Sequence, residues 1–529
     1  KSSNVTISDG TINMNYTADD GIKDKGVTEL ADAADSNGTT WALEYTDDTG
    51  IVTISGGLIT MTKTYGDGIQ AHDFVMSGGQ VNITTYYENA GLNYYNKSLS
   101  TYNTLTVQES QSSKTKTETV SVDTGGHKGI KAGNKAESWT YASVSDDSDY
   151  STEYTYYTEA SGGIEISGGT IVIDTTNTGV KYNSSSNSSS GNTTVAADSK
   201  VIIGAPEDGM KSQNDLTISG GAKLKINSVD DGISAAGTLT ITGEETVVDI
   251  QQAFEGIEAS VILVGEEDAT TSTGPYVSVY SMDDGINASG YDSITTTYVD
   301  DDEEQYTEVK KSTSGSHSFT NYSGTVVVMI GDDASHSYSL YVTDGQGVVD
   351  DNSTVTGSYS ADGDGIDCNG SLYIKGGTTV VWGPSSNDND GLDADDNNII
   401  YSGATVLVAG GSGMGGSPSL SGTYGVSYSS SVSSGTAFAV EDGSGSVLVA
   451  ALAPKAVSSI LFVSPDLTSG TSYSLYTGGT VSGLVNSNSS HDCRYSTYSG
   501  GTSSATATAS SSASSGNNSG PGNNMPGRN

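Results

Sequence analysis

The feature that most constrains the fold of this 529-residue chain is a short motif that returns eleven times along it. A glycine is preceded by a residue that is acidic in eight copies, and an Ile, Leu, Val or Met follows it. The shortest steps between successive motif glycines are 23 to 26 residues. The motif glycines are Gly21, Gly68, Gly91, Gly129, Gly179, Gly209, Gly232, Gly256, Gly285, Gly365 and Gly391. A repeat of this kind, with insertions between some copies, predicts a solenoid rather than a series of separate globular domains.

A second element lies between the motifs and reads as two short strands joined at a Gly-Gly pair. Examples are "VTISGGLITM" at 52–61, "IEISGGTIVI" at 164–173 and "LYIKGGTTVVW" at 372–382. Alternating apolar and polar residues are typical of a strand with one buried face, and Gly-Gly allows the bend between strands. About 23 residues with three short strands and glycine corners form one coil of a parallel β-solenoid. We therefore predict an all-β chain whose residues 1–410 form a right-handed parallel β-helix with Tyr-rich insertions.

The remaining sequence divides into two parts. Residues 411–484 read as a small antiparallel β module that covers the last coil, and residues 485–529 as a Ser/Gly/Asn-rich linker or flexible tail. In the coils, the apolar residue after each motif glycine is expected to face the core, where stacking joins a few Ile, Leu and Val per coil into continuous columns.

The charge of the chain limits its partners. With 64 Asp and Glu against 21 Lys and Arg, the formal net charge is −43, which excludes general nucleic-acid binding and favours cations. No stretch is apolar enough to span a membrane, and the Ser/Thr/Gly/Asn/Tyr-rich composition suits a secreted or cell-surface protein. Because the chain begins with Lys and shows no signal peptide, we expect a processed or truncated product. Cys368 and Cys493 match no metal-ligand spacing and leave open free thiols or one disulfide.

The corner acids predict calcium sites. Equivalent residues of neighbouring coils lie about 4.8 Å apart, and two carboxylates at that spacing repel each other by about 1–4 kcal/mol. Ca²⁺ removes that cost because it takes six to eight oxygen ligands, including backbone carbonyls. An alternative is that Asp suits a corner by bonding its own backbone. An EF-hand does not fit, since its last ligand position, counted from Gly391, is Asn397. The predicted calcium ligands are Asp19, Asp20, Asp67, Asp208, Asp230, Asp231, Asp283, Asp284, Asp362, Asp364, Asp367, Asp388, Asp390, Asp393 and Asp395.

Three lysines, Lys131, Lys181 and Lys211, each lie two residues after a motif glycine. They can neutralise the acids of their coils without metal. They can also act as the base of a calcium-dependent polysaccharide lyase, which removes a proton beside a uronate carboxylate. Both interpretations stay open at the sequence level.

Aromatic residues gather in the insertions. Aromatic faces stack on sugar rings, although a Tyr can equally pack an insertion onto the coils. The predicted carbohydrate-binding residues are Trp41, Tyr86, Tyr87, Tyr94, Tyr95, Trp139 and Tyr141.

The segments "EDGMKSQNDLTISGG", "DDGISAAGTLTITG" and "DGDGIDCNGSLYIKGG", followed by a strand module that ends in "YTGG", resemble one family. It is the bacterial secreted carbohydrate-binding domain-containing family, whose known member is a calcium-binding right-handed β-helix similar in fold to pectate lyases. The family binds cellulose and acidic plant polysaccharide. The resemblance covers nearly all of residues 1–482 and implies calcium at the matching corner acids.

Together these observations predict an extracellular bacterial protein that binds several Ca²⁺ ions and a polyuronate or cellulose-like polysaccharide without catalysis. A lyase is one alternative. The other is a structural subunit that assembles head to tail into a calcium-dependent fibre, because the chain opens directly on the coil strands "SSNVTISDGTINM".

Overall fold

The computed structural model is all-β, as predicted: none of the residues that it describes lies in a helix. It follows that no described segment is a helix long and apolar enough to cross a membrane. The strands β4, β5, β11, β12, β14, β15, β18, β27, β28, β31 and β32 are described by their backbone pairing alone. The other described residues are 4–17, 20–24, 50–64, 66–85, 128–133, 161–175, 208–228, 230–267, 273–289, 317–331, 363–385, 389–411, 417–489 and 491–512.

Among these residues, 27 strands join in one large sheet, and most of its pairings are parallel. The pairings fall into three continuous ladders, here called ladders A, B and C. Ladder A contains β1 (Asn4–Ile7), β6 (Ile51–Ile54), β9 (Asp73–Met76), β16 (Gly163–Ile166), β20 (Asp215–Ile218), β22 (Ile233–Ile241), β24 (Ile257–Val264), β29 (Ser318–Asn321), β34 (Ser371–Trp382), β35 (Asn397–Gly410) and β36 (Ser419–Ser421).

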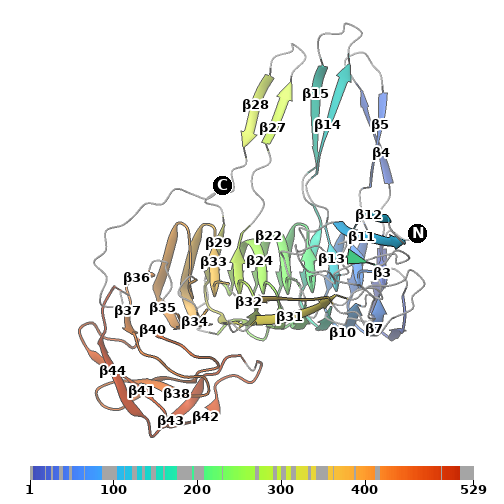
Figure 1. Ribbon diagram of the computed structural model, residues 1–529. Coiled ribbons are helices and arrows are strands. Elements are labelled where there is room, and N and C mark those ends of the chain that lie inside the picture. Colours follow the sequence, from blue (N-terminus) through green and yellow to red (C-terminus); the bar gives the residue numbers. More distant parts are fainter. Residues whose placement is uncertain are drawn as a thin grey trace.

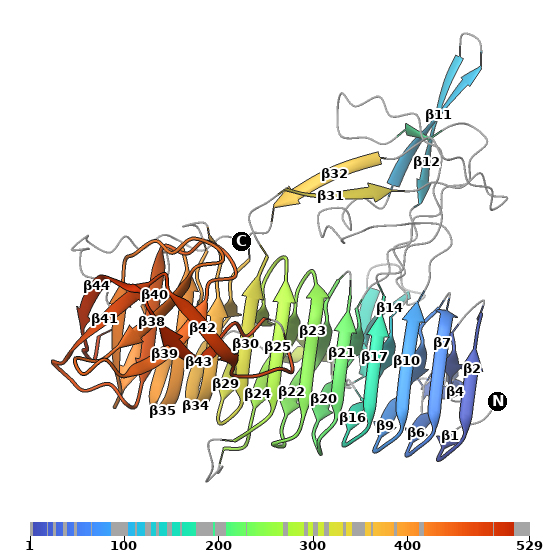
Figure 2. The ribbon, with the colours of Figure 1, turned by 90° about the horizontal axis from the view of Figure 1, so that it is seen from below.

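Ladders B and C are built in the same way. Ladder B contains β2 (Thr11–Met14), β7 (Leu58–Thr64), β10 (Gln80–Thr85), β17 (Thr170–Asp174), β21 (Lys223–Asn227), β23 (Val247–Ala253), β25 (Tyr276–Ser281) and β30 (Thr325–Ile330), followed by the second halves of β34 and β35. Ladder C contains β3 (Ile22–Lys23), β8 (Ile69–Ala71), β13 (Ile130–Ala132), β19 (Met210–Ser212), the first halves of β22 and β24, β26 (Ile286–Ala288) and β33 (Ile366–Cys368). The chain visits A, B and C in turn, which is consistent with a β-solenoid. Figure 2 shows successive strands stacked side by side along the molecule.

One hydrophobic core runs between the three ladders. Ile54 of ladder A, Ile59 of ladder B and Ile69 of ladder C are all fully buried in it. The prediction that the apolar residue after a corner glycine faces the core is confirmed for the described copies: Ile22, Ile69, Ile130, Met210, Ile233, Ile257, Ile286, Ile366 and Leu392.

Nine of the eleven predicted corners are described, and they stack directly on one another. Gly68 donates its amide hydrogen to Lys128 O, and Gly129 donates to Asp208 O, so the series passes from Gly68 to Gly129 to Gly209. Gly91 and Gly179 lie outside the described residues. The motif of one residue, glycine and an apolar residue is short enough to occur inside insertions as well as at corners.

Several insertions between ladder strands contain hairpins. Three of these hairpins are inserted between a strand of ladder C and the next strand of ladder A. Figure 1 shows them projecting from the same side of the stack. They are β4 (Thr28–Ala34) with β5 (Thr40–Thr46), β14 (Glu137–Val144) with β15 (Ser151–Thr158), and β27 (Thr295–Val299) with β28 (Gln305–Lys310). Between ladders B and C lie β11 (Thr104–Gln111) with β12 (Lys114–Ser121) and β18 (Thr194–Val195), and β31 (Ser335–Leu340) with β32 (Val355–Ser360).

The parallel stack ends at an antiparallel module. Strand β40 (Ser459–Ser464) runs antiparallel to β35 and to β37 (Tyr424–Tyr428). A second sheet contains β39 (Val447–Leu452), β38 (Ala437–Glu441), β41 (Ser472–Thr477) and β44 (Thr502–Thr508), and β42 (Thr480–Leu484) pairs with β43 (Tyr495–Ser499). Trp382, fully buried, joins the stack to this module, because its indole Nε1 donates to His491 O at 3.1 Å.

The module is longer than the sequence suggested. Residues 485–529 were predicted to be a linker or tail, but β43 and β44 lie there, and β44 pairs with β41 along its length. Its small Ala, Ser and Thr side chains resemble a linker in composition, yet they suit an edge strand of a small sheet. Cys368 is buried, and neither it nor Cys493 forms a disulfide.

Replacing a corner glycine should destabilise the stack. A Cβ on Gly256 would lie 2.1 Å from Val279 Cγ1 and 2.2 Å from Gly285 O, so Gly256→Ala must push two coils apart. We expect a loss of about 1–3 kcal/mol in the free energy of unfolding, measured by urea denaturation. Gly443→Ala is the matched control, because its Cβ would meet no atom within 4 Å. Equal urea midpoints for the two variants would contradict this account of the corners.

Candidate metal centre

The passage from ladder B to ladder C forms one continuous corner, here called the acidic corner. At each coil the amide of the corner glycine donates to the carbonyl of the residue before the next corner glycine, for example Gly209 N to Asp231 O at 2.9 Å and Gly285 N to Asp364 O at 3.0 Å. These hydrogen bonds align the residue before each corner glycine with the equivalent residue of the next coil. The residues at this first corner position are Asp20, Asp67, Lys128, Asp208, Asp231, Glu255, Asp284, Asp364 and Asp390.

Several of these carboxylates bond the backbone of the next coil. Asp20 Oδ1 accepts from Asp67 N at 2.7 Å, and Asp67 Oδ1 accepts from Lys128 N at 2.8 Å. Towards the other end, Asp284 Oδ1 accepts from Asp364 N at 2.7 Å, and Asp364 Oδ1 in turn accepts from Asp390 N. Aspartate therefore has a structural role at this corner. At the first corner position its hydrogen bond goes to the neighbouring coil, whereas Asp393 accepts from the amide of the next residue, Ala394, as the alternative supposed. The second oxygen of Asp20 pairs with Lys23, and that of Asp284 accepts from the side-chain amide of Asn287.

The residue two after each corner glycine, the second corner position, changes sign along the stack. From the N-terminal coil onwards it is Lys23, Gln70, Lys131, Lys211, Ser234, Glu258, Asn287, Asp367 and Asp393. In the first coils the lysines neutralise the acids: Lys23 forms an ion pair with Asp20, and Lys211 Nζ lies 2.9 Å from Asp208 Oδ2. From Ser234 onwards no described residue at this position is basic, so the acids face other acids.

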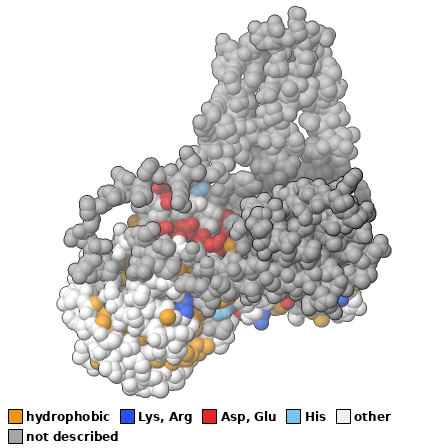
Figure 3. Space-filling view, in the orientation of Figure 1, with side chains coloured by type: hydrophobic (Ala, Val, Ile, Leu, Met, Phe, Trp, Pro, Cys, Tyr) orange, Lys and Arg blue, Asp and Glu red, His pale blue; other side chains and the backbone are white. Residues whose placement is uncertain are grey.

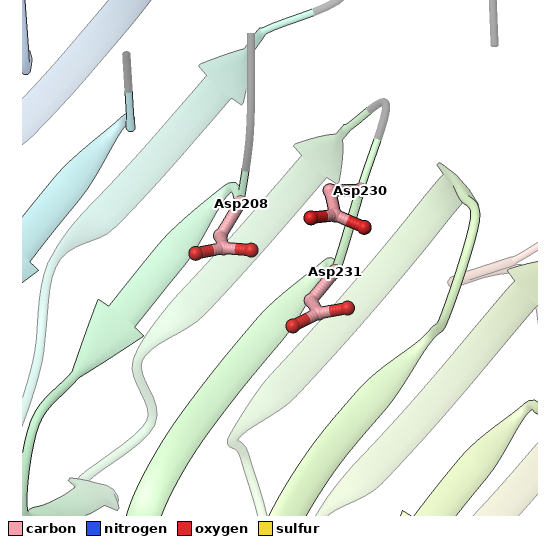
Figure 4. A group of neighbouring side chains, drawn as sticks. All are labelled: Asp208, Asp230 and Asp231. Carbon is pink, nitrogen blue, oxygen red and sulfur yellow. The ribbon is translucent and has the colours of Figure 1, made fainter. Parts of the chain in front are cut away.

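Three groups of acidic side chains can each bring ligand oxygens within 4.8 Å of one another. They are Asp208 with Asp230 and Asp231, Asp231 with Glu255 and Glu258, and Asp364 with Asp367 and Asp393. Figure 4 shows the first group, with Asp208 and Asp231 on adjacent coils and Asp230 beside them. Acidic side chains also form a band on the face of the molecule seen in Figure 3.

Asp208 is the clearest sign that the first group has a further partner. Its side chain is fully buried, and Oδ2 forms the ion pair with Lys211. Its Oδ1 has no hydrogen-bond donor among the described residues. A buried carboxylate oxygen without a donor is costly, because it has lost water and gained nothing in return. A carboxylate oxygen of Asp208 also lies within 4.8 Å of ligand oxygens of Asp230 and Asp231.

Burial and mutual repulsion shift the titration of these carboxyls. Burial raises the pKa of Asp231 well above its usual value, and the neighbouring Asp230 and Asp208 raise it further. Burial, with the charge of Asp283, raises the pKa of Asp284 to about 8. In the third group, burial with the nearby Asp393 raises the pKa of Asp364 to about 7 and of Asp367 to about 6. Without a cation, the acidic corner therefore holds protons that ordinary carboxyls lose.

The structure brings most of the predicted calcium ligands to this corner. Asp208, Asp230, Asp231, Asp364, Asp367 and Asp393 lie in the three groups, and Asp283, Asp284, Asp390 and Asp395 lie close to them along the same corner. Asp20 and Asp67 belong to the coils with lysines. Asp19, Asp362 and Asp388 lie outside the described residues. The prediction missed Glu255 and Glu258, although both flank the corner glycine Gly256 as the other ligands flank theirs.

Two of the three predicted lysines lie side by side on adjacent coils. Lys131 and Lys211 are direct neighbours in ladder C, whereas Lys181 lies outside the described residues. Burial lowers the pKa of Lys211, but the carboxylates of Asp208 and Asp231 outweigh burial and raise it overall. A lysine held in its charged form neutralises acids and does not favour a role as a base.

Three of the predicted carbohydrate-binding residues lie in inserted hairpins. Trp41 belongs to β5, and Trp139 and Tyr141 belong to β14, where they pair with Tyr156 and Tyr154 of β15. Tyr86, Tyr87, Tyr94 and Tyr95 lie outside the described residues.

Comparisons of the chain with protein families, with curated proteins and with solved structures found no match. The resemblance to the carbohydrate-binding family therefore stays a prediction.

Proposed function

We propose that this chain is an extracellular, calcium-stabilised β-helix that binds acidic polysaccharide. The single observation that carries the proposal is the reversal of charge along the acidic corner, from coils where lysines neutralise the acids to coils where acids face acids. Ladders A, B and C would be the three faces of a right-handed helix, the hand that parallel crossovers adopt almost without exception. Met210 pairs with Ile233, and Ile233 with Ile257, which supports coils of about 23 residues where no insertion intervenes.

The residues of the acidic corner suit calcium in their chemistry. Each group offers only carboxylate oxygens, which are the hard ligands that Ca²⁺ prefers. The buried Oδ1 of Asp208 would gain the partner that the described protein does not supply. Asp208, Asp230 and Asp231 would hold one ion, Asp231 with Glu255 and Glu258 a second, and Asp364, Asp367 and Asp393 a third. Bound calcium would neutralise the facing carboxylates and hold adjacent coils together.

A polyuronate is the polysaccharide that this chemistry favours, because calcium can bridge a protein carboxylate and a uronate carboxylate. The hairpins with Trp41, Trp139 and Tyr141 would add contacts to sugar rings. The lyase and the head-to-tail fibre stay predictions. The charged state of Lys211 does not favour a lyase. In a fibre, the antiparallel module at the end of the stack would have to contact the first coil of the next copy.

The proposal is tested by calorimetric titration of calcium into metal-free protein, followed by a glycan array with and without calcium. We expect calcium binding that the double variant Asp364→Asn, Asp367→Asn weakens by about tenfold or more at one site, and polyuronate binding that requires calcium. The matched control is Asp9→Asn with Asp466→Asn, which removes two acids from exposed turns elsewhere. Identical titrations for both double variants would count against the corner sites.

A further inference from the structure

A second constellation lies at the opposite passage, where ladder C returns to ladder A. His72 lies between β8 and β9, and its Nδ1 is 2.7 Å from Asp73 Oδ2. Its Nε2 is 3.1 Å from Ser161 Oγ, which the register of β9 and β16 brings to the same turn one coil later, 89 residues along the chain. Carboxylate, imidazole and hydroxyl thus form a chain of two hydrogen bonds within the range that nucleophile activation requires.

The backbone holds this arrangement from both sides. His72 N and Asp73 N both donate to Gly50 O, at 2.9 and 3.2 Å, while His72 O accepts from Gly133 N at 2.9 Å and Gly163 N at 3.0 Å. Gly162 has a φ of +69°, and a Cβ there would lie 2.3 Å from His72 O and 2.9 Å from two ring carbons. Only glycine can follow Ser161 at this distance from the imidazole.

Among the described residues, the passage from ladder C to ladder A contains no second histidine paired with a carboxylate and a hydroxyl. The other histidine at the passage, His317, is 4% exposed, and its Nδ1 lies 3.4 Å from the carbonyl oxygen of Ser260. The His72 side chain is 16% exposed and that of Asp73 38%, and Ser161 is half-buried. The hairpin β14–β15 leaves the stack just before Ser161.

We propose that Ser161, His72 and Asp73 form an acyl-transfer site that hydrolyses carboxylic esters. Asp73 is a positioning residue: it accepts the Nδ1 hydrogen and so leaves Nε2 as an acceptor. Ser161 Oγ attacks the ester carbonyl carbon while His72 Nε2 takes the hydroxyl proton. The carbon–oxygen bond to the alcohol then breaks, and His72 returns the proton to the leaving alkoxide. Water, deprotonated by His72 Nε2, then attacks the acyl carbon; the bond to Ser161 Oγ breaks, the acid leaves, and His72 returns the proton to Oγ. The Gly162 amide, next to the nucleophile, is the donor for the oxyanion.

The substrate class follows from the position of the site. It lies at the foot of hairpins whose aromatic residues are the candidates for sugar contacts, so the structure assigns it an O-acyl ester on a polysaccharide. This choice of substrate rests on the proposed polysaccharide binding, whereas the acyl-transfer chemistry does not.

The chemistry is tested on the full chain with p-nitrophenyl acetate and with an alkyl fluorophosphonate, whose adduct is located by mass spectrometry. We expect hydrolysis that Ser161→Ala and His72→Gln each reduce by about 100-fold or more, an unchanged rate for the exposed control Ser55→Ala, and an adduct on Ser161. Asp73→Asn should lower the rate and also alter the dependence of the rate on pH. A merely structural role for Asp73 would lower the rate without altering that pH dependence. Equal rates in Ser161→Ala and Ser55→Ala would overturn the proposal. The absence of an adduct on Ser161 would overturn it too, and that result does not depend on how well a variant folds, because labelling uses the unaltered protein.

A third arm separates the chemistry from the substrate. Acetate release from acetylated polygalacturonate supports the assignment in full. Hydrolysis of p-nitrophenyl acetate without acetate release, in a protein that binds the polymer on the glycan array, removes polysaccharide esters as substrate and leaves polysaccharide binding intact.

Discussion

Removal of calcium should lower the midpoint of thermal unfolding by roughly 5–10 °C compared with protein in excess calcium. A ligand that binds only the folded state, at a hundred times its dissociation constant, stabilises by about 2.7 kcal/mol per site. Three groups of acids line the acidic corner, so their contributions add along the stack. The carboxylates left behind repel one another across adjacent coils, which adds to the loss.

The measurement is a set of melting curves by circular dichroism, with calcium, with chelator and with magnesium. Magnesium should restore less stability, because it demands a near-ideal octahedron and gives up its water reluctantly. The double variant Asp364→Asn, Asp367→Asn should show a smaller calcium effect than Asp9→Asn with Asp466→Asn. Superimposable curves in calcium and chelator would remove calcium from the proposed function.

Metal-free protein should become less stable as the pH rises from about 5 to about 8, the reverse of ordinary acid unfolding. The raised pKa values give the sign. Asp284, with a pKa of about 8, and Asp364, with a pKa of about 7, keep a proton in the folded state that the unfolded chain loses near pH 4. The folded state therefore binds more protons across this window, and its stability falls as the pH rises through these values.

The expected loss is on the order of a few kcal/mol, and urea midpoints of calcium-stripped protein at several pH values would measure it. Saturating calcium should weaken the dependence, since the ion replaces the protons on Asp364 and Asp367 of the third group. Asp284→Asn should weaken it too, because a neutral amide is already present at every pH. A midpoint that rises with pH in the stripped protein would contradict the buried, mutually repelling state of these acids.

The coil architecture could be predicted because each coil repeats the same physical requirement. Ile233 and Ile257 follow corner glycines and pair directly, and the alternation in 164–173 marks ladder strands plainly. A motif of three residues does not by itself show which glycines stack: Gly68, Gly129 and Gly209 follow one another directly in the described corner. The strand β44 could not be recognised, since "TSSATAT" has no large apolar side chain and pairs through its backbone.

The candidate sites divide in the same way. The corner acids could be predicted because each lies beside the glycine that defines the repeat. Glu258 was missed although it follows Gly256 as Asp367 follows Gly365; the strand register adds that it lies near Glu255 and Asp231. Ser161 and His72 could not be paired from the sequence, because an insertion of unknown path separates them and neither residue belongs to the repeated motif.

The hydrogen bonds of the acidic corner all point one way. Asp20 reaches to the amide of Asp67, Asp67 to Lys128, Asp284 to Asp364 and Asp364 to Asp390, so each carboxylate depends on the coil that follows it in the chain. A coil made early in synthesis therefore holds an unfinished corner until the next coil arrives. Such a chain is asymmetric to shortening: cutting coils from the C-terminal side leaves a carboxylate without its backbone donor, whereas cutting them from the N-terminal side leaves backbone amides and carbonyls but no charged group without a partner it had before.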